Sequence, residues 1–469
     1  MAKNKQNSGS IFGKILITLI LGGIVAAAWY VYTAPEFERV KPEIVSPSEM
    51  FWNRTDPLEI KVKDNVALKN YEVSMSDGSK SVMIDQGTFE GAKKEDTLTV
   101  KFPKSKKLDP KAKEITVTVK VNDKSMWNML AGNSATKTVT IYVDYKRPNV
   151  NILSNSRMIH QGGSALVIFQ AQDEHLDKLY VKANKNMFKA QPYKKEGYYA
   201  ALIAWPFVDE NFDAKIVASD LAGNKREVHI PFYHKNPRYK TSHIKATDKF
   251  IDGKITDLAS SDPEYASITD RLKKLKAINE TMRLSNEAKI HALSKDVSDE
   301  ILDSWKIKKF YPLRNGQRVA SFGDHRYYYY QSKDNVVSES YHVGYDLASN
   351  SMADVKASNA GKVVFADENG IYGNMPLIDH GLGLYTLYGH CSQLLVNEGD
   401  EVSAGQVIAK TGMTGLALGD HLHFGMLVQG IEVRPVEWFD QSWITKFIDN
   451  VFKAADQIIT PPPVKETEK

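Results

Sequence analysis

Two short histidine motifs in the last third of the chain have the residue types and spacing to do chemistry. His421 and His423 lie two residues apart in the motif Asp420-His421-Leu422-His423-Phe424. Alternate side chains of a strand share a face, so both imidazoles are expected to point into one groove while the apolar residues around them pack inward. Such a pair on a buried strand has few purely structural uses, and we interpret it as functional.

The second motif, Tyr341-His342-Val343-Gly344-Tyr345-Asp346, places an imidazole and a carboxylate four residues apart. Gly344 between them is expected to relax the backbone so that both reach one ion. A catalytic zinc commonly takes three protein ligands and leaves a fourth position for water. His342, Asp346 and one histidine of the 421/423 pair supply that number. The net positive charge of such a site lowers the pKa of bound water from about 15.7 towards about 7 and polarises a substrate carbonyl.

These motifs, with a third one between them, resemble those of the lysostaphin-type (LytM-like) zinc endopeptidases. The pattern runs in the order His342…Asp346, Tyr388-Gly389-His390 and His421-Leu422-His423, and it covers residues 312–440. Supporting motifs are Phe322-Gly323, Tyr372-Gly373-Asn374, Asp379-His380-Gly381 and Gly399-Asp400. The resemblance does not extend to the N-terminal 300 residues.

The resemblance implies a role for each residue. It makes His342, Asp346 and His423 the Zn2+ ligands, and it sets His390 and His421 beside the metal-bound water as general base and as stabiliser of the oxyanion. It also implies peptidoglycan as the substrate, with hydrolysis of its peptide cross-links. Which peptide bond is cut stays open.

An alternative interpretation is that the protein has the same fold but no catalytic activity. Some members of the family have lost ligands and only activate other hydrolases. The alternative function is therefore a wall-binding scaffold or an activator of other cell-wall hydrolases. The five intact positions weigh against this alternative.

Three neighbouring side chains are assigned to packing or to the edge of the site. Cys391, the chain's one cysteine, is expected to pack, because its neighbour His390 would face the other way in a strand. His380, in an Asp-His-Gly turn, is expected to be structural. His325 is expected near the rim of the groove, and the aromatic run at residues 327–330 is expected to pack.

Strands and helices must hold these residues in place. Residues 311–440 are predicted to form a β-rich peptidase domain, with strands at 362–366, 376–379, 384–388 and 406–410 separated by glycine-containing turns. Residues 236–310 are predicted to form a helical linker that abuts this domain and covers part of its groove. Within it, Asp262-Pro263-Glu264 has the form of a helix start, and Ile268, Leu272, Leu275 and Met282 recur at helical spacing. Residues 441–469 are predicted to hold a short helix at 442–455 and a disordered tail from 461.

The region between residues 36 and 235 repeats itself. Strands at 58–62 and 166–171 each lead into an aspartate, Asp64 or Asp173, and then into a second strand. An Ala-Gly-Asn turn precedes the last strand of both halves, at 131–133 and 222–224. Two immunoglobulin-like β-sandwiches are predicted, at 36–146 and 147–235, with further strands at 115–121 and 215–218. We interpret them as spacers between the membrane and the enzyme.

The N-terminal segment places the protein at a membrane. Residues 15–32 form an uncharged, largely apolar run after Lys3, Lys5 and Lys14, with Trp29, Tyr30 and Tyr32 at its far end. This pattern is typical of a transmembrane helix with a cytoplasmic N-terminus. Residues 1–35 are therefore predicted to be a cytoplasmic tip and a single-pass anchor, with the bulk of the chain periplasmic or extracytoplasmic. A cleaved signal peptide is the alternative, and either reading exports the rest of the chain.

The whole chain is thus predicted to be multidomain and mainly β. It is expected to have a transmembrane helix, two sandwiches, a helical linker and a C-terminal LytM-like domain, which suits a length of 469 residues. The net charge of +4 gives no case for nucleic-acid binding. The expected partners are peptidoglycan and the membrane, with cell-wall synthesis or division proteins as further candidates.

Overall fold

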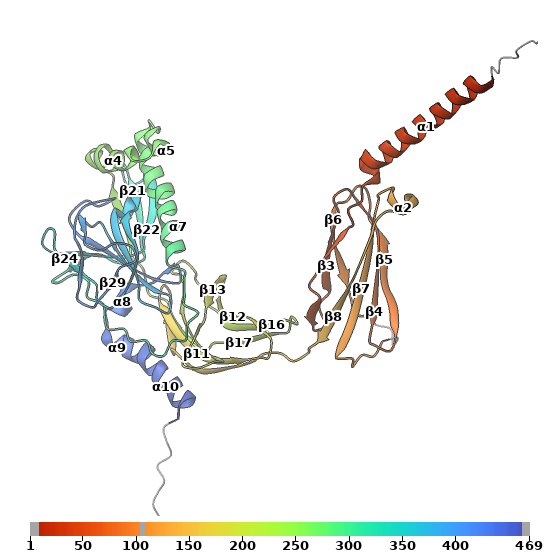
Figure 1. Cartoon of the computed structure of the whole chain (residues 1–469). Coiled ribbons are helices and arrows are strands. Elements are labelled where there is room, and N and C mark those ends of the chain that lie inside the picture. The colour runs from red at the N-terminus through yellow and green to blue at the C-terminus, as the bar shows by residue number, and fades with distance from the viewer. Residues whose placement is uncertain (1–8, 104–107, 462–469) are drawn as a thin grey trace, which may run out of the picture. The chain divides into compact units, whose positions relative to one another are not determined.

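The computed structural model describes residues 9–103 and 108–461, and its secondary structure is mainly β (Figure 1). The chain divides into two compact units. The first comprises Met1–Arg147 with Asp220–Asn224, and the second comprises Pro148–Ser219 with Lys225–Lys469. The predicted disorder of residues 462–469 and the lysines at positions 3 and 5 lie outside the described residues.

Helix α1 (Gly9–Thr33) begins the described chain. Its segment Phe12–Thr33 is the one span among the described residues that is long and apolar enough to cross a membrane. At about 1.5 Å per residue these 22 residues extend about 33 Å, close to the roughly 30 Å hydrocarbon core. A signal sequence has the same length and composition, so the anchor and the signal peptide both stay open.

The first unit is built from two sheets around one apolar core. One sheet has the strand order β1-β3-β6 and the other the order β2-β8-β7-β4-β5. The burial pattern of strand β3 shows why its sheet has one face on the core. Leu58, Ile60 and Val62 are buried and alternate with exposed charged residues. The strands predicted at 58–62 and 115–121 are confirmed as β3 and β7. The elements are η1 Pro35–Phe37, β1 Glu43–Val45, β2 Glu49–Trp52, β3 Leu58–Lys63, β4 Leu68–Ser76, β5 Ser81–Thr88, β6 Glu95–Val100, β7 Glu114–Asp123, α2 Trp127–Leu130 and β8 Ser134–Val143.

The second unit begins with two four-stranded sheets, β14-β15-β11-β9 and β13-β12-β16-β17, and a pair β10-β18. The strands predicted at 166–171 and 215–218 lie within β11 and β16. The elements are β9 Asn149–Asn155, β10 Met158–His160, β11 Ser164–Gln172, β12 Leu176–Ala183, β13 Asn186–Lys189, β14 Gln191–Pro192, β15 Tyr198–Ala204, β16 Ala214–Asp220, β17 Lys225–His229 and β18 Tyr233–Lys235.

These sheets share a core with the C-terminal helices. Strand β11 is buried on both faces, because helices of the chain end pack on it. Ser156 Oγ donates a hydrogen bond to the carbonyl of Phe447 at 2.7 Å, and the indole N–H of Trp438 donates to Ser164 Oγ at 3.2 Å. The helix predicted at 442–455 is observed in three successive pieces. The C-terminal elements are α8 Pro435–Trp438, α9 Gln441–Ile444, η5 Thr445–Asp449 and α10 Asn450–Ile459.

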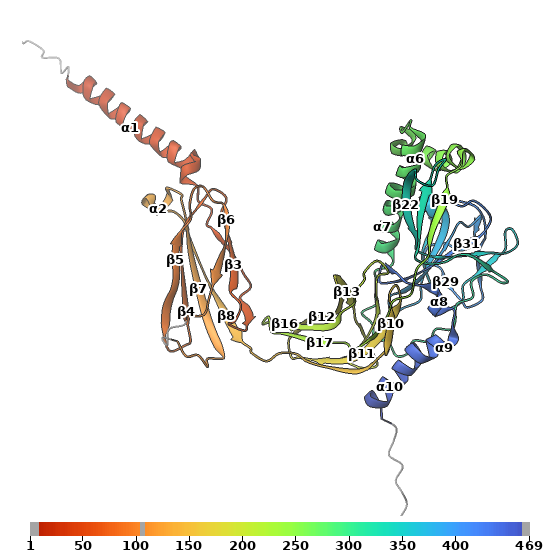
Figure 2. The same cartoon turned by 180° about the vertical axis from the view of Figure 1, so that it is seen from behind.

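Residues 236–310 contain one strand and a run of short helices. Strand β19 (Thr241–Lys245) pairs in parallel with β21 (Asp324–Tyr329) and completes a sheet with β22 (Val336–His342). Figure 2 labels β19 and β22, and Figure 1 labels β21. The cap predicted at Asp262 is confirmed, since its carboxylate accepts the Glu264 N–H at 2.9 Å. Helical structure nevertheless begins earlier, after a cap at Thr247. The helices are α3 Asp248–Phe250, η2 Ile251–Ile255, α4 Thr256–Ser260, α5 Pro263–Ala266, α6 Arg271–Lys276, η3 Ala277–Met282 and α7 Arg283–Leu293.

The remaining strands form the sheet that carries the histidine motifs. Its order is β20-β23-β31-β27-β26-β25-β29, with β32 paired to β31, and β24-β30-β28 form a separate small sheet. Leu275, Ile278 and Met282 of the helices pack on its apolar side chains in one buried cluster. The four strands predicted in this region are confirmed as β25, β26, β27 and β30. The elements are β20 Gln317–Ala320, β23 Tyr345–Ala348, β24 Asp354–Lys356, β25 Gly361–Glu368, η4 Gly370–Tyr372, β26 Asn374–Asp379, β27 Leu384–Gly389, β28 Gln393–Leu394, β29 Glu401–Val402, β30 Val407–Lys410, β31 Leu422–Val428 and β32 Ile431–Glu432.

Replacing Trp438 with alanine is expected to destabilise the second unit by about 3–5 kcal/mol, because a large buried aromatic side chain would leave a cavity. Trp438 is fully buried, with ring centroids 5.1 Å from Trp443 and 6.3 Å from Phe310. Differential scanning calorimetry measures the loss. The matched control is Tyr233→Ala at a side chain that is 77% exposed, where the change should stay within about 0.5 kcal/mol. Equal effects of the two substitutions would contradict the shared core.

Candidate functional site

Strand pairing brings the two histidine motifs together. In the antiparallel pair β23·β31, Asp346 lies opposite His423, and in the pair β27·β31, Gly389 lies opposite the same histidine. His342 is the last residue of β22, and the short turn through Gly344 returns the chain into β23. Residues about 80 positions apart in the chain therefore meet at one end of these paired strands.

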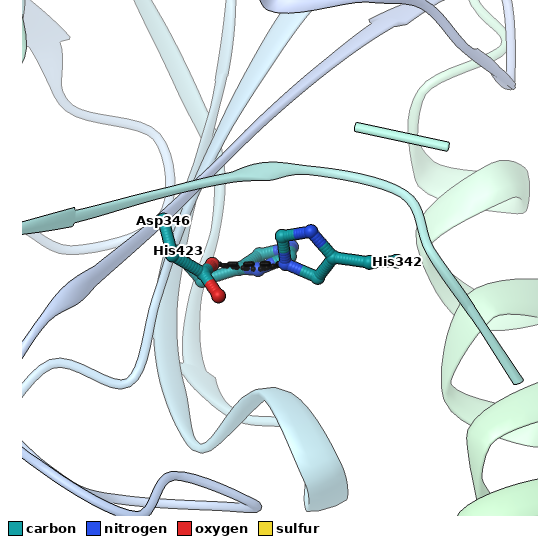
Figure 3. Close-up of side chains that lie close together, drawn as sticks. All are labelled: His342, Asp346 and His423. Atoms are coloured by element: carbon teal, nitrogen blue, oxygen red, sulfur yellow. Dashed lines mark hydrogen bonds and ion pairs between the residues drawn. The ribbon is translucent and has the colours of Figure 1, made fainter. Parts of the chain in front are cut away.

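The side chains of His342, Asp346 and His423 converge at this point (Figure 3). Asp346 Oδ1 lies 2.9 Å from His342 Nε2 and 2.8 Å from His423 Nδ1, and the two nitrogens are 3.1 Å apart. All three residues are buried. The sequence predicts these three as metal ligands, and the structure brings them together as one donor set.

The chemistry of this donor set fits a zinc ion. His342 Nδ1 lies 2.9 Å from the carbonyl oxygen of Ser321. Because a carbonyl only accepts, Nδ1 carries the proton, and Nε2 keeps its lone pair for a metal. Two imidazole nitrogens and one carboxylate oxygen within reach of one point are a common zinc set that leaves a position open.

The protonation states also suit a metal. Burial alone would raise the pKa of Asp346, but the close approach of His342 and His423 holds it well below its usual value. Burial lowers the pKa of His423 to about 4, even though Asp346 raises it. At neutral pH the carboxylate is therefore ionised and this imidazole neutral, which are the states that bind metals.

Position 344 must be a glycine because the His423 ring lies against its backbone. A Cβ at this position would lie 2.4 Å from Cε1 and Nε2 of His423. From the sequence, a glycine is expected here to relax the backbone. Gly344 has no positive φ, so the tight approach of the His423 ring is the physical reason for it.

His390 and His421 stand beside the donor set. Their ring centroids are 4.8 Å apart, and His421 Nε2 lies 3.7 Å from Asp346 Oδ2. Each donates from Nδ1 to a carbonyl oxygen, that of Thr414 at 2.9 Å for His390 and that of Gly419 at 2.7 Å for His421. Nε2 of both rings is therefore left for the site.

The backbone and burial of His390 are unusual. It follows β27 with a φ of 66°, a left-handed conformation that is uncommon for a residue with a side chain and is often found at functional sites. Burial, together with His423 and His421, lowers its pKa well below the usual value. His390 is consequently neutral at pH 7, with a lone pair on Nε2.

Cys391 and His380 have structural settings. The Cys391 thiol is buried and donates to the carbonyl of Tyr388 at 3.2 Å, and burial raises its pKa to about 12. The expectation that it packs is confirmed, although the left-handed turn at His390, and not strand alternation, directs it inward. His380 is held by the Ala360 carbonyl and Thr386 Oγ1, both at 2.7 Å. Its expected structural role is likewise confirmed.

His325 does not line the groove. Its ring stacks on Tyr341 with centroids 4.2 Å apart. Its neighbours in β21, Asp324 and Arg326, are the residues that line the groove. Arg326 was missed from the sequence, although strand alternation around His325 could have revealed it.

The donor set lies in a groove of about 1180 Å³. One wall comes from residues 240–250 and from Arg283 of α7, which lie far from the motifs in the sequence. The expectation that residues 236–310 cover part of the groove agrees with this wall. No local motif in this segment marks an individual residue as part of the site.

Tyr372 links the donor set to Glu287, a half-buried acid on α7. Its ring centroid lies 5.4 Å from that of His423, and its hydroxyl donates to Glu287 Oε1 at 3.3 Å. Burial raises the pKa of Glu287 to about 7. This acid therefore changes its charge near neutral pH behind the site.

Comparison with known proteins finds similarity in this part of the chain. Residues 340–435 match peptidase family M23. The chain is 40% identical over 95 residues to DD-carboxypeptidase/endopeptidase Mpg of Neisseria meningitidis serogroup B, which covers 20% of this chain and 22% of that protein. It is 40% identical over 95 residues to peptidoglycan DD-endopeptidase ShyA of Vibrio cholerae, covering 20% and 21%.

A third relative is named differently. The chain is 39% identical over 85 residues to murein hydrolase activator EnvC of Escherichia coli, covering 18% of this chain and 20% of that protein. The matched segments thus span about a fifth of each of these three relatives.

Gly344→Ala is expected to weaken zinc binding by roughly tenfold or more, because the new Cβ would displace the His423 ring. Competition with a chromophoric chelator measures the affinity, and circular dichroism checks the fold. Gly253→Ala is the matched control, since a Cβ at Gly253 meets nothing within 4 Å. Unchanged zinc affinity in Gly344→Ala would show that the ring does not need this space.

Glu287→Gln is expected to stabilise the protein at pH 8 and to leave it almost unchanged at pH 5. The folded-state pKa of about 7 lies above the ordinary 4.5, so the stability contributed by the neutral acid is complete below pH 4.5 and is lost as the pH rises through 7. Glutamine keeps the neutral form, which is worth up to about 3 kcal/mol at pH 8. Urea denaturation at both pH values tests this, with Glu264→Gln as the exposed control. A stabilisation that is equal at both pH values would contradict the expectation.

Proposed function

Residues 340–435 belong to peptidase family M23, and from this premise we propose that the chain is a zinc-dependent endopeptidase that hydrolyses the peptide cross-links of peptidoglycan. The names of two relatives, a DD-carboxypeptidase/endopeptidase and a peptidoglycan DD-endopeptidase, support this substrate.

The observation that carries the proposal is the buried donor set in the groove, flanked by two further histidines. His342, Asp346 and His423 would hold the zinc ion. When bound, zinc supplies a Lewis acid that polarises the scissile carbonyl and makes water acidic enough to attack at neutral pH.

The two flanking histidines would accept and donate the protons that move during hydrolysis. His390, neutral and with Nε2 free, accepts the proton of the attacking water as general base. The same proton then passes to the amine nitrogen that leaves when the peptide bond breaks. His421 donates from Nε2, when that atom is protonated, to the oxygen of the tetrahedral intermediate.

Helix α1 supports a location at the cytoplasmic membrane. We propose that it anchors the chain, with residues after 35 on the outer side, where peptidoglycan lies. In this proposal residues 36–146 and 147–235 are immunoglobulin-like spacers, residues 236–310 a helical linker, residues 311–440 the peptidase domain and residues 441–469 its C-terminal helix and tail.

A second candidate is an activator of other wall hydrolases, because one relative is named as an activator. All five polar residues of the proposed centre are present in this chain, and their convergence favours catalysis. Zinc binding and cleavage by the purified protein separate the two candidates.

His423→Ala is expected to abolish both zinc binding and cleavage, because a ligand is removed. His390→Ala is expected to retain zinc and to lower kcat by about 100- to 10,000-fold, the usual contribution of a general base. Digests of defined cross-linked muropeptides, analysed by mass, measure cleavage, and a zinc chelator should stop it.

The matched control is His229→Gln, at a side chain of β17 that is 60% exposed. It should cleave as the wild type does. Wild-type protein that binds no zinc, or that binds it and leaves every muropeptide intact, would contradict the enzyme and favour the activator.

A further inference from the structure

The groove beside the donor set is lined by basic side chains. Five of them contribute to its walls: Lys240, Lys245, Arg283, Arg318 and Arg326. All five precede residue 340, where the match to the peptidase family begins. These positive charges therefore come from the part of the chain that precedes the matched segment.

The carboxylates of the groove are already engaged. Asp346 belongs to the donor set. Asp420 accepts hydrogen bonds from Thr411 Oγ1 at 2.6 Å and from Ser351 Oγ and the Met352 N–H, both at 3.1 Å. In the described part of the chain, Lys240 and Arg318 form no ion pair. The groove consequently carries positive charge that an anionic ligand would balance.

Arg326 is held by two carboxylates, one of which belongs to the donor set. Its Nε lies 3.4 Å from Asp324 Oδ2, and its Nη2 lies 3.9 Å from Asp346 Oδ2. The Asp324 carboxylate is itself held by Ser242 Oγ at 2.8 and 3.0 Å. The Arg326 side chain is 18% exposed and lines the groove. A guanidinium held along one edge can offer its remaining N–H groups to a carboxylate next to the metal.

Strand β19 explains how this arrangement is built. Its parallel register sets Ser242 beside Arg326. The carbonyl of Lys240 accepts the His325 N–H at 2.9 Å, which fixes the backbone of Lys240 along the same wall. The added strand therefore both positions Arg326 and brings a lysine to its side.

The positive charge of the groove would distinguish between two kinds of peptidoglycan cross-link. Where two stem peptides are joined directly through the side-chain amine of a diamino dicarboxylic acid, that residue keeps a free carboxylate on the carbon that bears the scissile nitrogen. A lysine in the same place has no such carboxylate. A bridge of glycine residues has no charge near the scissile amide. A guanidinium a few ångströms from the donor set matches the first arrangement.

Resting on the proposed peptidase function, we propose that Arg326, assisted by Lys240 and Arg318, forms a carboxylate-binding subsite. This subsite selects cross-links with a free carboxylate beside the scissile amide. Arg326 is then a specificity-determining residue.

The test compares two substrates in the zinc-loaded full-length protein. One is a cross-linked muropeptide dimer with the free carboxylate, and the other is the same dimer with that group as a primary carboxamide. We expect the wild type to favour the free acid by about tenfold or more in kcat/KM, since charge-assisted hydrogen bonds would be lost. Arg326→Gln should bring the ratio close to one, chiefly by losing activity on the free acid.

Further variants separate recognition from support of the metal ligand. Arg326→Lys keeps the charge without the planar fork and should give an intermediate ratio. The double variant Lys240→Gln/Arg318→Gln, at side chains without an ion pair to the donor set, should lower the ratio in part. Lys249→Gln, at an exposed lysine of α3 that does not line the groove, should keep the wild-type ratio.

Two outcomes of the cleavage experiments overturn the subsite. One is a wild type that cleaves both dimers equally, which leaves the proposed function intact. The other is an equal loss of both activities in Arg326→Gln with an unchanged ratio in the double variant, which would make Arg326 only a support for Asp346.

Binding tests the subsite apart from cleavage. The two dimers are titrated into zinc-loaded His390→Ala protein. Weaker binding of the carboxamide sustains the subsite, and equal binding overturns it. A wild type that binds the free acid selectively but never cuts it would overturn the peptidase function alone.

Discussion

The pairing register between β23 and β31 is the constraint on which the site depends. It sets Asp346 opposite His423, and side chains of a strand change faces when the register slips by one residue. A slip would therefore turn one of these two groups into the core and separate the donor set. The register is secured because β31 is buried along its whole length and pairs with β27 on its other side.

Burial then sets the charges of the site. The same low exposure that keeps His390 and His423 neutral would make an isolated carboxylate expensive. Asp346 stays ionised because the rings of His342 and His423, whose nitrogens lie 2.9 and 2.8 Å from its Oδ1, favour the charged carboxylate. The three residues therefore stabilise one another in the states that a metal needs.

The surrounding elements decide the shape and charge of the groove. Residues 240–293 cover one side of the sheet and contribute β19 as an extra strand beside β21. The sheets of residues 148–219 share a buried core with the C-terminal helices of the same compact unit. The matched family segment is thus embedded in packing that earlier parts of the chain supply.

The sequence by itself determined the features that are local. Apolar runs and alternation located α1, β3, β7 and the strands of the histidine-bearing sheet. Residue types at short spacing named His342, Asp346 and the pair His421 and His423, and the resemblance to a known family added His390. Only the tertiary structure decided that Arg326 and not His325 lines the groove, that β19 forms a wall, and that Glu287 lies behind Tyr372. These depend on pairings between segments far apart in the chain, which no local periodicity encodes. Charge and burial follow from those pairings, so the selectivity of the groove becomes visible only once the chain is folded.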